Sequence, residues 1–242
     1  MRRALLPRLA LVAVGAGLAA GTSAVTTAAT ASCPSAVTVE RLQSARTIRA
    51  DLGGNGRLEQ ARVVRSKDAP SQCRWFVVVR SATRTASIPL PRTLVALGRP
   101  ELFGVVRLGG DRRREIVVRS NLGANTEAFA LYAFERGAIK RVRIAVRGSH
   151  DLLYAGAGGS LLAVACLDRG PRHVVASEAV SNGVTVRVDR HMFRLAGDRL
   201  VQTSSQKLTN ANPKKLPEFR GAERLGIRGL AFSGCDLRLP GK

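Results

Sequence analysis

The sequence predicts an all-β protein of short antiparallel strands. In Val184–Val188 valines alternate with polar residues, the spacing that places apolar side chains on one face of a strand. Trp75–Val79 and Ala128–Phe134 are apolar throughout, so both are expected to be strands buried on both faces. Glycine-containing turns separate the apolar runs, and helical periodicity is scarce.

Two segments predict hairpins. Phe134–Val142 and Arg194–Gln202 each contain a central glycine between two short strand-like runs. Helix is expected only in Arg92–Leu97 and Pro213–Phe219, where nearby proline and glycine limit it to a turn or two.

The N-terminal 31 residues are typical of a secretory signal peptide. Arginines precede an apolar run at residues 9–20, and a small-x-small pattern ends at Ala31. The run is shorter than the roughly 20 residues that span a membrane. Cleavage is expected after Ala31, with Ala24 as the alternative, and residues 32–242 are expected to form one secreted domain without a transmembrane span.

The chain is strongly basic. Its 39 Lys and Arg residues outnumber 17 Asp and Glu, for a net charge of +22, which falls to +19 when residues 1–31 remove three arginines and no acid. This excess favours an anionic cell-envelope polymer as partner, with a protein ligand as the alternative. Aromatic residues make up only 4% of the chain. Because single-stranded nucleic acid is held largely by aromatic stacking, no specific nucleic-acid recognition is expected.

Four cysteines lie after the signal peptide and predict two disulfide bonds in an exported protein. Of the three possible connectivities, Cys33 with Cys73 and Cys166 with Cys235 is favoured, because each bond closes a moderate loop near a terminus. No two cysteines have the close spacing of a zinc site.

Two similar loops indicate an internal repeat. Asp51–Glu59 reads DLGGNGRLE and Arg107–Glu115 reads RLGGDRRRE, with the closing glutamates 56 positions apart, and a weaker copy, CLDRGPRH, closes at His173. A β-branched run follows each loop. We expect repeats of about four short strands each, at residues 48–103, 104–160, 161–206 and, in part, 225–239.

The segments DLGGNGRLEQARVVRS and VVRLGGDRRREIVVRS together resemble the FG-GAP (integrin-like, VCBS-type) repeats of β-propellers, in the form seen in exported actinobacterial proteins. The resemblance implies four-stranded blades around an axis. Since a closed propeller usually needs at least four blades, three clear repeats imply a partial or small propeller-like arrangement.

The same resemblance implies a calcium loop of the form D-x-D-x-D-G-x-x-D/E, in which a glycine turn brings oxygen ligands around a hard cation. Asp51, Asn55 and Glu59 match ligand positions, whereas Gly53 replaces the second carboxylate. The first loop is therefore expected to hold at most a weak calcium site, and no other cofactor is expected.

The second loop has lost its first acidic ligand to Arg107 but keeps Asp111 and Glu115. We expect an arginine guanidinium to take the place of the cation and to pair with both acids. On this reasoning, loss of Asp111 is expected to cost more stability than loss of Asp51.

No residue pattern predicts a catalytic site. His150 and Asp151 are adjacent, His173 and His191 are isolated, and no serine lies in a G-x-S-x-G motif. Polar loops at equivalent places in two repeats are the better candidates for a ligand-facing surface; their residues are Asn121, Asn125, Thr126, Ser181 and Asn182.

These observations favour a secreted, non-enzymatic binding or scaffolding module of the cell envelope. The alternative is a secreted hydrolase with its site on the propeller axis or on a loop face. Convergence of the histidines and nearby acids within hydrogen-bond reach would distinguish the hydrolase.

Overall fold

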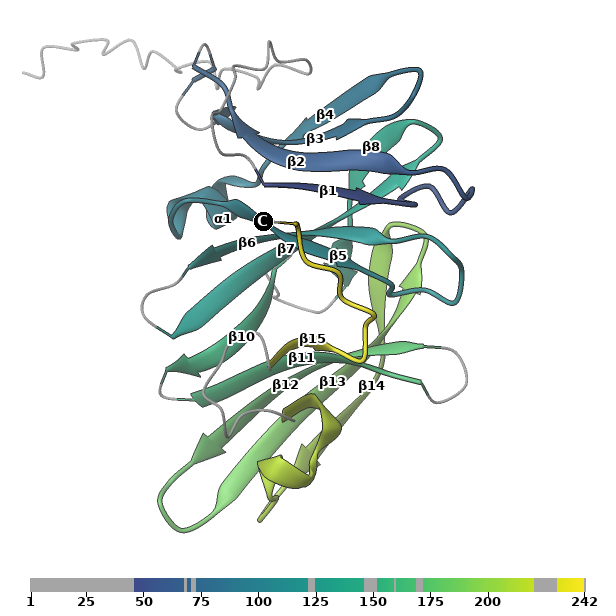
Figure 1. The fold of residues 1–242 in the computed structure, drawn as a ribbon. Helices are drawn as coiled ribbons and strands as arrows, with labels where there is room; N and C mark the ends of the chain where they lie inside the picture. Colours follow the sequence, from purple (N-terminus) through teal and green to yellow (C-terminus); the bar gives the residue numbers. More distant parts are fainter. Residues whose placement is uncertain are drawn as a thin grey trace, which may run out of the picture. The chain divides into compact units, whose positions relative to one another are not determined.

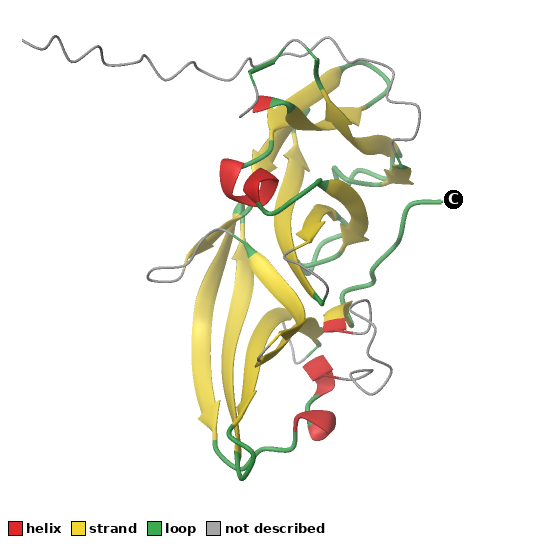
Figure 2. Ribbon diagram, turned by 90° about the vertical axis from the view of Figure 1, so that its left-hand side faces the viewer, coloured by secondary structure: helices red, strands yellow, loops and turns green. Residues whose placement is uncertain are grey.

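The computed structural model describes residues 46–67, 69–70, 73–121, 125–145, 152–158, 160–168, 172–219 and 230–241. Over these residues the protein is all-β, as predicted, and its helical segments are no longer than five residues (Figure 2). None of the helices in these ranges has the length and hydrophobicity needed to cross a bilayer. The predicted signal peptide lies outside the described residues.

The first sheet is a four-stranded antiparallel meander in which each strand pairs with the next along the chain (Figure 1). Its strands are β1 (Thr47–Ala50), β2 (Glu59–Arg65), β3 (Trp75–Arg80) and β4 (Thr85–Pro89).

The second sheet has 11 strands and contains two further meanders. The first consists of β5 (Glu101–Val106), β6 (Glu115–Asn121), β7 (Thr126–Glu135) and β8 (Ala138–Arg141). The second consists of β11 (Ser160–Leu167), β12 (His173–Ser181), β13 (Val186–Ala196) and β14 (Arg199–Leu208). The second strand of each meander begins at the last residue of one of the three similar loops in the sequence: β2 at Glu59, β6 at Glu115 and β12 at His173.

Two linking strands join these meanders into one sheet. β10 (Leu153–Gly158) pairs with the start of β7 on one side and with β11 on the other. β9 (Arg143–Ala145) pairs in parallel with β14. Gly156 has φ of +129°, and a Cβ there would lie 2.0 Å from the carbonyl oxygen of Asn125, so only glycine lets β10 approach β7 this closely. The pairings over the described chain form no closed ring of blades.

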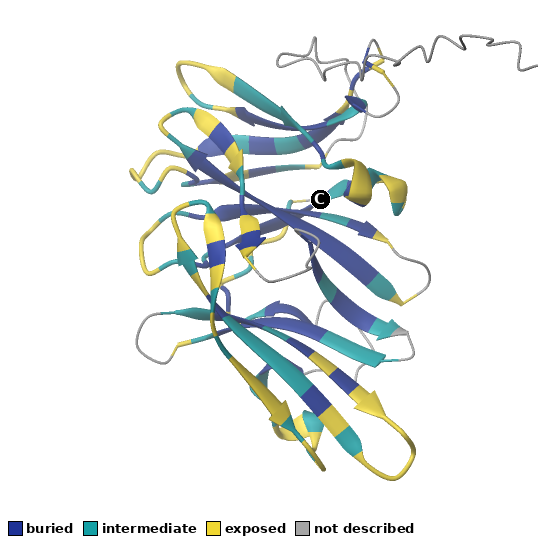
Figure 3. Cartoon of the chain, turned by 180° about the vertical axis from the view of Figure 1, so that it is seen from behind, coloured by how far each residue is buried: buried dark blue, intermediate teal, exposed yellow. Residues whose placement is uncertain are grey.

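The β5–β8 meander is a layer with two buried faces. One face, including Val105 and Tyr132, packs in a core with the first sheet. The other, including Val106 and Phe129, packs in a second core with β11–β14. Eight consecutive residues of β7 are buried, which confirms the prediction for Ala128–Phe134 (Figure 3).

β3 confirms the corresponding prediction, since Phe76–Val79 are buried. One expected strand position is wrong. Val184 is 91% exposed, because β13 begins only at Val186 and Val184 lies in the preceding turn.

Both segments that were predicted to be helical contain a short helix or 3-10 turns. α1 (Arg92–Ala96) follows β4, and two 3-10 turns, η2 (Pro213–Lys215) and η3 (Pro217–Phe219), follow β14. A buried carboxylate fixes η3, because Glu218 Oε1 accepts hydrogen bonds from Arg190 Nε at 2.6 Å and from Ser177 Oγ at 2.9 Å.

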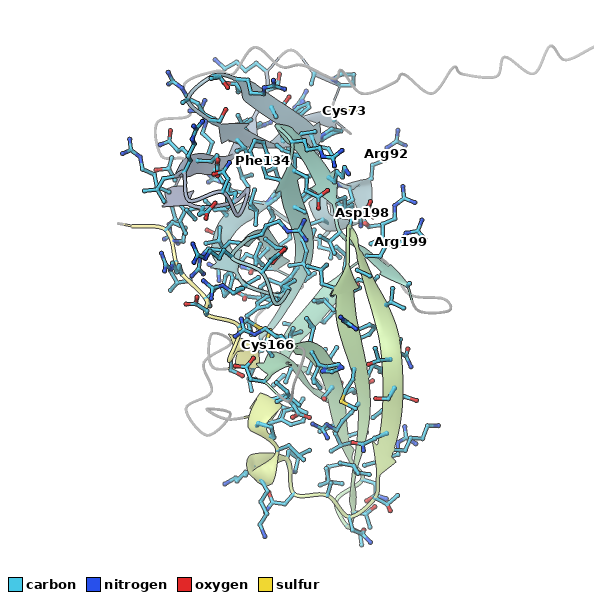
Figure 4. All side chains as sticks on the ribbon, turned by 90° about the vertical axis from the view of Figure 1, so that its right-hand side faces the viewer. Cys73, Arg92, Phe134, Cys166, Asp198 and Arg199 are labelled. Carbon is cyan, nitrogen blue, oxygen red and sulfur yellow. A yellow bond between two sulfur atoms is a disulfide. The ribbon has the colours of Figure 1, made fainter. Side chains whose placement is uncertain are left out.

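A C-terminal strap, residues 230–239, connects the last meander to β5. β15 (Ala231–Ser233) pairs in parallel with β11, and the predicted disulfide between Cys166 and Cys235 follows (Figure 4). Arg238 and Val105 then exchange two backbone hydrogen bonds of 2.9 Å. The described part of the expected fourth repeat thus supplies one short strand and the strap.

Cys73 is also disulfide-bonded. It is buried beside Val64, Phe76 and Val78 on the face of the first sheet that turns away from β5–β8. The predicted partner, Cys33, lies outside the described residues.

Gly104→Ala is expected to destabilise the protein by about 1–3 kcal/mol in urea unfolding. A Cβ at this position would lie 2.4 Å from the backbone oxygen of Arg238, so the strap must shift and weaken its hydrogen bonds to β5. Gly110→Ala is the control, since a Cβ there meets no atom within 4 Å. Equal, small effects of both substitutions would contradict close packing of the strap on β5.

Candidate functional site

The loops that contain the predicted metal ligands gather at one edge of the sheets, on the right of Figure 1. A Cβ at Gly54 of the β1–β2 loop would lie 3.3 Å from Arg113 of the β5–β6 loop. Arg172 of the β11–β12 loop donates a hydrogen bond of 3.0 Å to the carbonyl oxygen of Arg107. We call this surface the arginine edge; it comprises residues 51–58, 81–84, 107–114, 136–140, 168 and 172.

The first loop is closed by its own backbone. The Asp51 carboxylate accepts the N–H groups of Asn55 and Gly56, each at 2.9 Å, and Asn55 Oδ1 accepts Arg57 N–H at 2.9 Å. Glu59 Oε2 accepts the N–H of Leu52 at 2.9 Å. These bonds give the loop a defined shape without another group.

The first loop does not fit the implied calcium site. Four of the five side-chain oxygens on Asp51, Asn55 and Glu59 already accept backbone N–H groups. Among the described residues, no three His, Cys, Asp or Glu side chains are grouped as metal ligands. Calcium takes six to eight oxygens, which is more than the side chains of these three residues offer.

The second loop repeats one feature of the first. Leu108 N–H donates to Glu115 Oε2 at 3.0 Å, as Leu52 N–H does to Glu59. Arg113 occupies the space between the two retained acids, with its Nε 3.9 Å from Asp111 Oδ2 and 3.3 Å from Glu115 Oε1. An arginine thus lies near both acids, as expected, but the bidentate hydrogen bonding of a guanidinium to each acid is not formed, since both contacts are made by Nε and neither is a hydrogen bond. The Arg113 guanidinium also pairs with Glu135 on β7.

The third loop uses the same substitution. Arg172 Nε donates to Asp168 Oδ1 at 2.7 Å, and this hydrogen bond holds the pKa of Asp168 below its usual value. In the second and third loops, a guanidinium therefore lies beside the acids that remain.

The contacts of the two acids favour the opposite of the expected ranking, with Asp51 contributing more to stability than Asp111. The Asp111 side chain is 59% exposed and contacts Arg113 only at 3.9 Å. Asp51 instead closes its loop with two short hydrogen bonds. Arg113 does not depend on Asp111, because it also contacts Glu115 and Glu135.

Four exposed arginines of the edge lack an acidic partner within the described ranges: Arg57, Arg84, Arg112 and Arg136. Three of them line a pocket of about 280 Å³ formed by the β1–β2 loop and the β3–β4 and β7–β8 turns. A wider hollow of about 660 Å³ adjoins it around Arg113, Glu135 and Lys140.

These arginines were not predicted as site residues, because oxygen-bearing side chains were expected as the ligands. Each lies in or beside a turn: Arg57 follows Asn55 and Gly56, Arg84 ends the turn after β3, and Arg136 precedes Gly137. The three arginines of the pocket thus lie in the connections of three separate hairpins, β1–β2, β3–β4 and β7–β8, and the sequence does contain this pattern.

The predicted ligand-facing loops lie at the opposite edge. Thr126, Gly156, Leu162 and Glu178 are register partners in successive strands, so the β6–β7 and β12–β13 loops share an edge. Thr126 on β7 and Glu178 on β12 are therefore three strand spacings apart, roughly 14 Å in all.

The described residues of those loops have structural roles. Asn182 Oδ1 accepts the N–H groups of Val184 at 3.0 Å and Thr185 at 2.7 Å, and Asn125 O accepts Ala157 N–H at 2.8 Å. Asn121 and Ser181 end β6 and β12. These side chains form no shared cluster with a distinct chemistry.

The histidines do not form a catalytic group in the described part of the chain. His173 begins β12, whereas His191 lies in the middle of β13 beside Phe193, with ring centroids 6.5 Å apart. Neither is hydrogen-bonded to a described carboxylate. His150 and Asp151 lie outside the described residues.

Comparison with known protein families, with curated proteins and with solved structures finds no match for this chain. We therefore infer function from the geometry of the arginine edge.

Glu115 is the buried acid of this edge. Its side chain is fully buried, and burial raises its pKa to about 7, against the opposing effects of the Leu108 N–H and of Arg113. The protonated form is therefore favoured in the folded protein relative to the unfolded chain.

Asp51→Ala is expected to lower the free energy of unfolding by about 1–2 kcal/mol, because two backbone N–H groups lose their acceptor. Asp111→Ala is expected to cost less than about 1 kcal/mol, since an exposed ion pair at this separation contributes little. Urea unfolding of both variants measures the difference. A larger loss in Asp111→Ala would show that the second loop depends on this acid.

Glu115→Gln is expected to remove one component of the pH dependence of stability. Because the folded pKa is raised from 4.5 to about 7, the stabilisation by Glu115 is full below pH 4.5 and is lost as the pH rises through 7. The loss is about 3 kcal/mol at 1.36 kcal/mol per unit. The variant should therefore gain stability relative to the parent between pH 4.5 and 8, measured by urea unfolding. A pH-independent difference would contradict the raised pKa.

Proposed function

We propose that this protein is a secreted, non-enzymatic binding module that holds an anionic polymer of the cell envelope at its arginine edge. The observation that carries the proposal is the set of four exposed guanidinium groups without acidic partners at that edge. The acids retained in the loops are already taken by other groups, as Asp168 is by Arg172.

Unpaired guanidinium groups favour oxyanions for two reasons. Each carries a permanent positive charge, and its planar donors match the oxygens of phosphate, sulfate or carboxylate groups. The net charge of +22, or +19 once residues 1–31 with their three arginines are removed, adds a long-range field of the same sign, which raises the rate at which an anionic partner arrives.

Export to an oxidising compartment is part of the proposal. The disulfide between Cys166 and Cys235 supports it, because such bonds persist mainly outside the cytosol. The N-terminal sequence, with arginines before a short apolar run, supports it independently.

We also propose that the three meanders are diverged FG-GAP-like repeats. Each has four antiparallel strands in chain order, and the Leu N–H to Glu bond recurs between the first two strands of two of them. On this proposal, arginine replaced calcium as the group that holds the later loops, and the charges left over became the binding surface.

The proposal is tested by binding of the purified protein to heparin and to a poly(glycerol phosphate) at increasing salt. Exposed charges are screened beyond about 8–10 Å at physiological ionic strength. The affinity is therefore expected to fall roughly ten- to hundredfold between 50 and 200 mM salt. Neutral dextran is the control polymer. Absence of binding at low salt, or binding that ignores salt, would contradict the proposal.

A further inference from the structure

Three turns of the arginine edge surround a single pocket of about 280 Å³, which we call the turn pocket. Its basic residues come from separate hairpins: Arg57 from the β1–β2 loop, Arg84 from the β3–β4 turn and Arg136 from the β7–β8 turn. The remaining lining residues are Asn55, Leu58, Glu59, Ser81, Ala82, Thr83, Phe134 and Gly137. The pocket therefore lies where the first two meanders meet.

The approach of Arg84 depends on a glycine. A Cβ at Gly137 would lie 2.7 Å from Cδ and 2.9 Å from Nη1 of Arg84, so the arginine packs directly on the β7–β8 turn. Gly137 also has φ of +80°, which the turn requires. Arg84 is thus brought next to Arg136 by the backbone of the neighbouring hairpin.

The charge of the pocket is positive even after its acid is counted. Glu59 is the acidic residue in the lining, and its Oε2 accepts the N–H groups of Leu52 and Gly53. Arg57, Arg84 and Arg136 have no acidic partner among the described residues. Two positive charges therefore remain uncompensated.

We propose that the turn pocket is a subsite for one phosphodiester or sulfate ester group of the polymer, an inference that rests on the proposed function. Three guanidinium groups from three turns suit a tetrahedral group, whose several oxygens accept donors from different directions. A carboxylate has two coplanar oxygens, which one guanidinium fork satisfies.

The pocket also offers contacts for the chain that bears this group. The hydroxyl of Thr83 lines it, and Leu58 is 67% exposed at its wall, where it can contact the carbon atoms between successive ester groups. Leu58 is the one large exposed apolar side chain in the lining. Membrane-surface binding usually requires a broader apolar face, so a soluble polymer is the favoured source of the group.

The test compares two triple variants of the full protein with equal loss of charge. Arg57→Gln/Arg84→Gln/Arg136→Gln removes the basic groups of the turn pocket. Arg65→Gln/Arg92→Gln/Arg99→Gln removes three exposed arginines that also lack a described acidic partner. The control residues lie away from the arginine edge: Arg65 ends β2, Arg92 begins α1, and Arg99 precedes β5. Figure 4 shows Arg92 on the opposite side of the protein from Phe134, which lines the turn pocket.

Binding is measured by titration calorimetry at fixed salt with poly(glycerol phosphate), dextran sulfate and polygalacturonate, and with phosphatidylglycerol vesicles. The pocket variant is expected to lose at least about thirtyfold in affinity for the phosphate and sulfate polymers, and the control variant no more than about threefold. For polygalacturonate, both variants should lose the same small factor. Unchanged thermal unfolding of both variants shows that the fold is retained.

Other outcomes overturn the subsite in separable ways. Equal losses in both variants would leave a net-charge attraction, so the proposed function would stand and the subsite would fall. An equally large, pocket-specific loss for polygalacturonate would overturn the tetrahedral group. Pocket-specific binding to vesicles but not to the phosphate polymer would assign the site to a lipid headgroup. Failure of the parent protein to bind any polymer would remove the proposed function itself.

Discussion

Burial of both faces of the β5–β8 layer is the constraint on which the rest of the structure depends. Successive residues of these strands point into two different cores, one shared with the first sheet and one with β11–β14. Apolar strands of this kind are stable only between two covering layers. Because the other two meanders pack on the two faces of this layer, the equivalent loops of all three meanders lie at a common edge, where they form the candidate site.

The loops at this edge show two ways of holding the same backbone turn. In the first, Asp51 and Glu59 accept N–H groups of the loop itself. In the second, a glutamate accepts the equivalent N–H group while Arg113 balances the acids. An arginine supplies positive charge permanently, so such a loop needs no exchangeable cation. The cost of the arrangement is the burial of Glu115, which raises its pKa.

The candidate binding surface consists of arginines that have no acidic partner among the described residues. Arg107 and Arg114 are taken by Asp236 of the strap, and Arg113 by its three acids, so these arginines serve the fold. Arg57, Arg84 and Arg136 have no such role, and they converge on one pocket. The proposed oxyanion site and the ion pairs that stabilise the loops therefore use the same residue type in different surroundings.

The sequence by itself determined the strand class, both glycine hairpins and the short helical turns, because these follow from local periodicity and turn chemistry. It favoured the pairing of Cys166 with Cys235 on loop length, and the structure decided among the three possible connectivities. The sequence also indicated that an arginine would hold the second loop, since only Asp111 and Glu115 remained there to be neutralised. Only the tertiary structure decided that this arginine is Arg113, that β10 links two meanders, and that the strap returns to β5. It alone decided which arginines stay unpaired, because ion pairing and pocket shape depend on contacts between hairpins far apart in the chain, which no local pattern encodes.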